Sequence, residues 1–336
     1  MKEFGLTLEE TRIMFSYQYH LVLADIEYET NLDKKSLKRK WLSKWKDSTE
    51  LFLKSQIDQD TVTNISFHLL TDFDQLKKSV KELTVLKANK LTLYLVLLEL
   101  TLFKPYYSLG DNSEVFKDLR ICDEEKLKKK LRFFAKTLDI DPDVVKRFQS
   151  NYKEAIEGIK GGFNPWILGV VGAVLLVVVA AFFTPAIAAL LAPILAPGLS
   201  GAAAVSAVLA ALGGGAIAAG GFGMAGGFAV IVAGGAILGA GAGVGVGNLF
   251  AQSPDMALTQ AAKLEVIMKE IVYIQKDIRL AQEIIKEQRQ AIRSLEDKLD
   301  ELSRNHDKNK KEIENLEKSI EFLRNALKRN QDLSNQ

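Results

Sequence analysis

The feature that most constrains this chain is a long stretch without a single charged side chain. No Lys, Arg, Asp, Glu or His occurs between Lys160 and Asp255, a span of 94 residues that holds 21 of the 24 glycines. Charged side chains are costly inside a lipid bilayer, so a stretch of this kind is typical of membrane-inserting segments. We therefore divide the 336-residue chain into a head (residues 1–160), a hydrophobic block (residues 161–254) and a tail (residues 255–336).

One segment of the block meets the requirements of a transmembrane helix. Pro165 to Thr184 is a run of 20 uncharged residues, and a helix of that length crosses a hydrocarbon core of about 30 Å. Trp166 lies at its start, where an aromatic side chain suits the membrane interface. Basic residues flank the block on both sides, which predicts an even number of crossings. We expect a hairpin of two, with head and tail on the cytosolic side; four crossings would need nearly every residue of the block.

Small residues in the second half of the block follow a regular spacing. Gly235, Gly239, Gly243 and Gly247 lie four residues apart, and on a helix this spacing makes a shallow groove that lets another backbone approach closely. The pattern resembles the glycine zippers of pore- and channel-forming proteins. The layout of the whole chain is similar to that of helical pore-forming toxins of the cytolysin A type and of apolipoprotein L-like proteins. The resemblance implies self-assembly in a bilayer, while the residues alone also fit a hairpin anchor whose two helices pack together.

Helix-start signals and apolar residues at helical spacing predict an all-helical head. The leucine-rich run from Leu91 to Phe103 alternates as a strand would, but its length and its helical neighbours favour a buried helix. Helix starts are expected near Thr7, Asp33, Asp72, Asp123 and Asp141.

Two segments of the head carry a family resemblance. Phe15 to Glu27 (FSYQYHLVLADIE), together with the later DEEKL at Asp123 and FAKTLDIDPDVV ending at Val145, resembles the tellurite-resistance TerB-like helical domain across residues 10–150. The resemblance implies binding of a divalent metal at Asp25 and Glu27. Because Ile26 stands where the family's Ala-Asp-Gly element has glycine, we expect solvated acids at a helix end and no metal ion.

The second expected helix combines basic and aromatic side chains. Seven basic residues and no acidic ones occur from Lys34 to Lys46, and Leu37, Trp41 and Trp45 share one stripe of the helix. This helix either lies on an anionic lipid surface or buries its tryptophans in the core of the head while the basic side chains stay in water. The residues assigned to lipid contact are Lys34, Lys35, Lys38, Arg39, Lys40, Trp41, Lys44 and Trp45.

A heptad pattern begins at Leu264 and continues through the tail for ten repeats, which predicts a long coiled-coil helix. The e and g positions supply no pair of opposite charges, so a parallel homodimer has no electrostatic support, and self-association or a partner helix both remain open. In the alternative, the polar stretch from Ser303 to Lys310 is a turn that folds the tail back on itself. The expected core residues are Ile271, Ile278, Ile285, Ile292, Leu295, Leu299, Leu302, Ile313, Leu316, Ile320 and Leu323.

No pattern in the sequence indicates catalysis. None of the three histidines has a second metal ligand at the spacing that metal sites use. The single Cys122 has no base partner in the sequence, and no phosphate-binding loop is present. The net charge of +2 provides no basic field for nucleic acid. We therefore expect no enzyme, cofactor, metal or small-molecule substrate.

The fold class expected from these patterns is all-α, and the expected location is a membrane. Because the N-terminus lacks the apolar core of a signal peptide, the head is expected to stay in the cytosol, and a soluble form before insertion remains open. One hypothesis is a self-assembling toxin-like or defence protein that forms a pore or perturbs a bilayer. The other is a membrane-anchored scaffold or tether whose head and coiled coil bind partner proteins.

Overall fold

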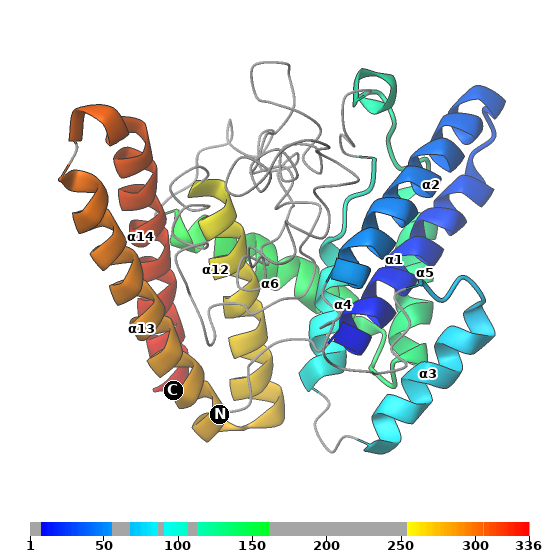
Figure 1. The fold of residues 1–336 in the computed structure, drawn as a ribbon. Helices are drawn as coiled ribbons and strands as arrows, with labels where there is room; N and C mark the ends of the chain where they lie inside the picture. The colour runs from blue at the N-terminus through cyan, green and yellow to red at the C-terminus, as the bar shows by residue number, and fades with distance from the viewer. Residues whose placement is uncertain are drawn as a thin grey trace. The chain divides into compact units, whose positions relative to one another are not determined.

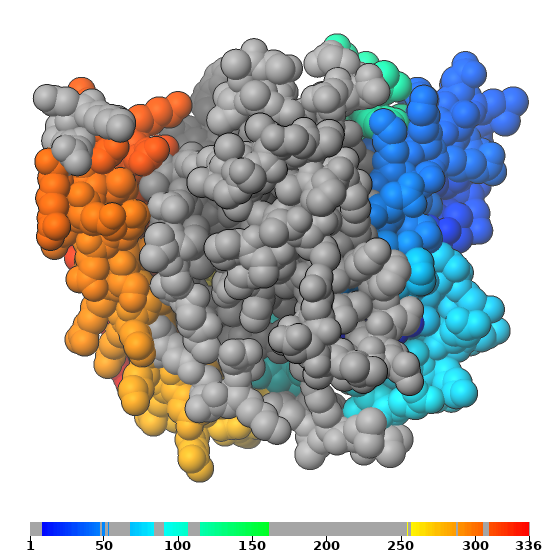
Figure 2. Space-filling view, in the orientation of Figure 1, coloured from blue at the N-terminus to red at the C-terminus, as the bar shows by residue number. Residues whose placement is uncertain are grey.

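The computed structural model describes residues 8–55, 68–86, 91–106, 113–160, 254–304 and 306–335, and the rest of the chain is grey in Figure 1 and Figure 2. Every regular element in these ranges is a helix, so the all-α prediction is confirmed for them. The described residues separate into two compact units, one of residues 8–146 and one of residues 147–160 with 254–335. The division falls inside one helix, ahead of the boundary at residue 160 that the sequence suggested.

The first unit is a bundle of short helices arranged around α1. Helix α1 (Leu8–Tyr28) contacts α2 (Leu32–Ser55), α3 (Phe73–Leu86), α4 (Leu91–Leu102) and α5 (Glu124–Thr137). The leucine-rich α4 is a helix and not a strand, and ten of its twelve residues are buried. The 3-10 helix η1 (Ser113–Phe116) and the start of α6 (Asp143–Ile159) complete the unit.

Three aspartates cap helices of this unit as the sequence predicts. The Asp72 carboxylate accepts hydrogen bonds from two backbone N–H groups at the start of α3, at 2.8 and 3.1 Å. Asp123 accepts from the N–H of Lys126 at 2.9 Å, and Asp141 accepts from the N–H of Asp143 at 2.8 Å. These bonds satisfy donors that have no partner inside the first helical turn.

The second unit contains the tail, which is not one continuous helix. Helix α12 (Pro254–Lys269) passes into the π-helix η4 (Glu270–Gln275), and α13 (Ile278–Ser303) and α14 (His306–Ser334) follow. Helix α14 contacts both α12 and α13, and α13 runs antiparallel to α14 (Figure 1). The unbroken ten-heptad helix is therefore wrong, and the alternative in which the tail folds back near Ser303 is confirmed.

Local geometry explains both breaks in the tail. Lys276 adopts a left-handed backbone with φ of 56°, and the side chain of Asp277 then caps α13 by accepting from the N–H of Leu280 at 3.0 Å. At the second break, the Asn309 amide donates to the carbonyl of Leu302 at 3.0 Å. A short polar cap at each corner lets the heptad stripe turn and pack against itself.

Most of the expected coiled-coil residues are buried, and the helices that bury them belong to the same chain. The predicted core position of Ile278 is wrong, because this residue lies at the corner between η4 and α13 and is 39% exposed. Leu299 and Leu302 are half-buried near the other end of α13. The buried members of the set are Ile271, Ile285, Ile292, Leu295, Ile313, Leu316, Ile320 and Leu323.

A buried polar pair interrupts the apolar contact between α13 and α14. The Asn330 amide donates to the Gln288 side-chain oxygen at 3.1 Å, and both residues are fully buried. A hydrogen-bonded pair at core positions restricts the alignment of two helices, because any shift leaves polar groups without partners.

Candidate functional site

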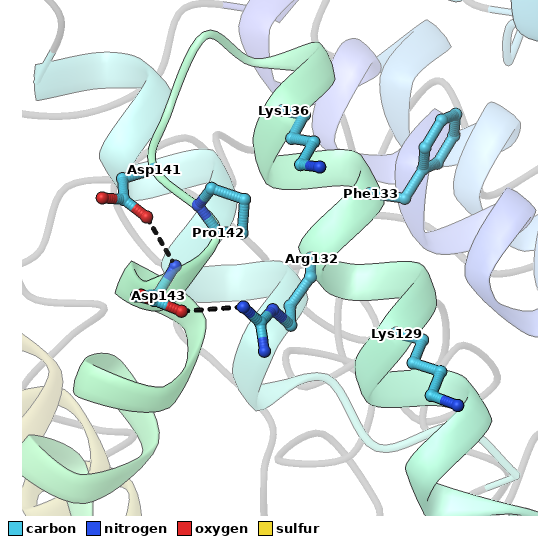
Figure 3. Close-up of a pocket in the computed structure, with 7 residues that line it drawn as sticks. All are labelled: Lys129, Arg132, Phe133, Lys136, Asp141, Pro142 and Asp143. Carbon is cyan, nitrogen blue, oxygen red and sulfur yellow. Dashed lines mark hydrogen bonds and ion pairs between the residues drawn. The ribbon is translucent and has the colours of Figure 1, made fainter.

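The outer face of α5 and the start of α6 together form an open cavity of about 530 Å³, which we call the α5 groove (Figure 3). Figure 3 shows Arg132 reaching from α5 to Asp143, with Asp141 and Pro142 on the opposite wall. The residues that line the α5 groove are Lys129, Arg132, Phe133, Lys136, Asp141, Pro142 and Asp143.

The amphipathic pattern of α5 places these side chains on its outer face. Leu127, Leu131, Phe134 and Ala135 are buried, so they anchor one side of the helix in the core. The four groove residues of α5 follow the spacing i, i+3, i+4, i+7, which puts them on a single stripe of the outward side. The sequence contains this spacing, but it does not show which face of the helix is exposed, and the stripe was not among the predicted site residues.

Only some of the charged side chains in the α5 groove form ion pairs. The Arg132 guanidinium donates to Asp143 at 2.8 Å, and Asp141 is occupied as a helix cap. In the part of the chain that the structure describes, Lys129 and Lys136 form no ion pair. Among the described residues, the α5 groove therefore presents two ammonium groups outside any ion pair, and its three basic and two acidic residues leave it net positive.

Aromatic rings adjoin these cations. Phe133 is 43% exposed, and its ring lies 5.7 Å from that of Phe73. The Lys130 ammonium lies 5.2 Å from the ring centroids of both Phe133 and Phe134, within the range of cation–π attraction. The exposed ring of Phe133 is thus held in place beside the basic stripe.

The basic residues of α2 that the sequence assigned to lipid contact divide into two groups. Lys38, Trp41 and Trp45 are buried, so lipid contact does not hold for them, and the alternative of core packing is confirmed for the tryptophans. Their rings stack with centroids 6.1 Å apart. Lipid contact stays a prediction for the others: Lys34, Arg39 and Lys40 are exposed, and Lys35 and Lys44 are half-buried.

Lys38 is buried because two carboxylates neutralise it. Its ammonium lies 2.7 Å from Asp25 Oδ2 and 3.0 Å from Glu29 Oε2. The hydroxyl of Tyr106 also donates to Asp25 Oδ2, and the backbone N–H of Cys122 donates to Asp25 Oδ1 at 2.8 Å. Asp25 is therefore not the solvated acid that the sequence suggested, whereas Glu27 is exposed.

The contacts around Asp25 shift the pKa values of Asp25 and Cys122. Burial alone would raise the pKa of Asp25, but hydrogen bonds from Lys38, Tyr106 and Cys122 outweigh it, and the pKa falls below its ordinary value. Burial together with the nearby Asp25 raises the pKa of the Cys122 thiol to about 11. Since a thiolate is the reactive form of cysteine, Cys122 is a poor nucleophile at neutral pH.

A second charged region, in the other unit, joins the two helices that flank the hydrophobic block. Arg147 of α6 donates to both oxygens of Glu270 at 3.0 Å, and Lys269 at the end of α12 lies 2.9 Å from Glu154 of α6. We call these two pairs the flank clamp. It ties the helix that enters the block to the helix that leaves it.

Helix α14 reinforces the flank clamp. The Arg329 guanidinium donates to both oxygens of Glu265 in α12, at 2.6 and 2.7 Å, and the Asn325 amide donates to the carbonyl of Ile159 at 3.0 Å. Burial raises the pKa of Glu270, and Arg147 offsets only part of that effect. An ionised Glu270 is therefore less favourable in the fold than in water.

The predicted hairpin lies outside the described residues, and so do Trp166, Gly235, Gly239, Gly243 and Gly247. Within the described ranges, no helix combines the length and the apolar composition that crossing a bilayer requires. In those same ranges, no three His, Cys, Asp or Glu side chains gather closely enough to hold a metal ion. Comparison of the chain with protein-family models, curated proteins and solved structures gave no match.

Proposed function

We propose that this chain is a non-enzymatic, membrane-inserting helical protein that oligomerises to form a pore or to perturb a bilayer. The 94 uncharged residues between Lys160 and Asp255 supply the inserting segment. The four-residue glycine spacing inside that segment supplies a surface on which helices can associate. The TerB-like character of the head is a further proposal, which rests on the quoted residues of α1, α5 and α6.

The observation that carries this proposal is that both flanks of the hydrophobic block belong to one unit. Lys269–Glu154 joins α6 to α12 and Arg147–Glu270 joins α6 to η4, which continues α12, so the chain enters and leaves the block from the same helical body. A segment anchored in this way favours an even number of crossings, because its two ends stay on one side of the membrane.

The experiment that tests the proposal is release of a trapped dye from vesicles by the purified full-length chain. We expect release that rises steeply with protein concentration, since a pore needs several copies. The matched control lacks residues 161–254 and should release nothing.

The scaffold hypothesis gives a different result in the same assay. A scaffold would insert, resist extraction from the vesicles by alkaline carbonate, and release no dye. Recovery of the intact chain in the carbonate supernatant would contradict both hypotheses, because each requires an integral segment.

A further inference from the structure

The α5 groove carries an excess of positive charge that the fold does not use. Helix α5 holds six basic and two acidic residues, and Lys129 and Lys136 have no ion-pair partner among the residues described. The two lysines are seven residues apart, about 10 Å along the helix axis, which is more than one phosphate group spans. The lining has three basic and two acidic residues, so its net charge is +1 with the carboxylates of Asp143, paired with Arg132, and of Asp141, the α6 cap, both counted.

We propose that the α5 groove is a contact surface for an anionic lipid bilayer, in which Lys129 and Lys136 bind headgroup phosphates and Phe133 enters the interface beside them. The proposal rests on the membrane-inserting function proposed above and identifies the class of membrane that the chain would select.

The aromatic ring distinguishes a lipid surface from a soluble phosphate compound. A soluble anion gains from lysines, but it gains nothing from a phenylalanine that is 43% exposed. At a membrane interface the same exposed ring is stabilised, because headgroup and acyl regions meet at that depth. Lys130 lies against the ring, which keeps Phe133 close to the basic stripe.

The position of the α5 groove along the chain also suits a membrane. Asp143 in one wall begins α6, whose 17 residues span about 25 Å and end at Ile159, so that only Lys160 lies between this helix and the uncharged block. Helix α2 differs in its tryptophans: Trp41 and Trp45, which lie among its basic residues along the helix, are buried and so offer no ring to a membrane interface.

The test measures binding of the full-length chain to vesicles with about 30% phosphatidylserine, which is anionic, and to vesicles of phosphatidylcholine alone. The variant is Lys129→Gln/Lys136→Gln. Its control, Lys78→Gln/Lys81→Gln, removes the same charge from exposed positions of α3 in the same unit. Circular dichroism of each variant checks that the helices are intact.

We expect wild type to prefer the anionic vesicles. Each lysine neutralised in the α5 groove should weaken that binding about fivefold, so the double variant should bind about thirtyfold more weakly. The control should change binding by about twofold or less. Phe133→Ala should weaken binding to anionic vesicles without changing its dependence on salt, because it removes no charge.

Three results would overturn the proposal. Equal losses in the two lysine variants would show a general charge effect, and no loss in either would show that the α5 groove does not contact lipid. Competition by soluble glycerophosphate, beyond that of sodium chloride at equal ionic strength, would identify a small-molecule phosphate site. Dye release is measured in parallel, so a wild type that binds anionic vesicles through α5 without leakage would refute the pore and leave the lipid surface intact.

Discussion

Replacing Lys38 by methionine should strongly destabilise the head. The side chain of Lys38 is fully buried, and its two partners, Asp25 and Glu29, are 1% and 10% exposed. Methionine matches the length of the lysine stem, so the change creates little cavity. It leaves two adjacent carboxylates without a cation in an environment that water reaches poorly.

The size of the effect follows from this burial. Removing one partner of a buried ion pair costs about 3–5 kcal/mol, because the other charge stays desolvated. Asp25 keeps hydrogen bonds from Tyr106 and Cys122, which places the expected loss near the lower end, about 3 kcal/mol. Against a total stability of about 5–15 kcal/mol this is a large fraction, and it corresponds to a fall in melting temperature of roughly 10 °C.

The assay is urea unfolding of the full-length chain in mild detergent, followed by tryptophan fluorescence. Two of the three tryptophans, Trp41 and Trp45, are in the head, so a Trp166→Phe background makes the signal specific for that unit. The control is Lys40→Met, an exposed position on the same helix, which should cost less than about 0.5 kcal/mol. A loss below about 1 kcal/mol for Lys38→Met would refute the reasoning.

The pH dependence gives a second check on the same cluster. The folded pKa of Asp25 lies below its ordinary value of 3.8, so the folded state favours the ionised form. Its contribution to stability is therefore complete above about pH 4 to 5 and is lost as the pH falls through the lowered pKa. In Lys38→Met the carboxylate loses its cation, so this acid-dependent loss should shrink and move to higher pH.

Three other substitutions test the tail and the block. Glu270→Gln should leave the free energy of unfolding at pH 7 unchanged within about 1 kcal/mol or raise it. Burial raises the pKa of this carboxyl, so in the wild type its protonation adds stability as the pH falls. A loss above about 2 kcal/mol in urea unfolding would contradict this. Gln288→Leu/Asn330→Leu should keep or increase the free energy of unfolding but loosen the alignment of α13 and α14. The expected sign is faster amide hydrogen exchange along both helices, and unchanged exchange would count against a role of the pair in register. Gly239→Leu/Gly243→Leu should preserve membrane insertion but reduce crosslinked oligomers and dye release, and wild-type behaviour in all three would favour the scaffold.

The tail shows where a sequence pattern leaves two structures open. An unbroken heptad repeat is satisfied equally by one long helix with a partner and by a helix that turns back and packs on itself. A few residues at the two corners decide between these structures. They are the left-handed Lys276, the Asp277 cap and the Asn309 amide at the second corner. The same reversal explains the exposure of Ile278, which the heptad places in the core but the corner leaves in water.

Helix α2 shows the corresponding difficulty for charge. Seven basic residues look alike in the sequence, and only one of them is buried between carboxylates. A signal was present, since Lys38 lies three and seven residues before Trp41 and Trp45 and so shares their face of the helix. The partner Asp25 is on another helix, and no periodicity within α2 indicates it.

The helical character of the described flanks, the caps at Asp72, Asp123 and Asp141 and the uncharged block follow from the sequence, because caps, periodicity and the absence of charge are properties of neighbouring residues. Only the tertiary structure decided which face of each helix meets another. It buried Lys38 against Asp25, exposed Phe133 on the same outer face of α5 as Lys129, and joined Arg147 to Glu270. Each of these pairings depends on how separate helices pack, and the energy of a charge or a ring depends on the neighbours that packing supplies.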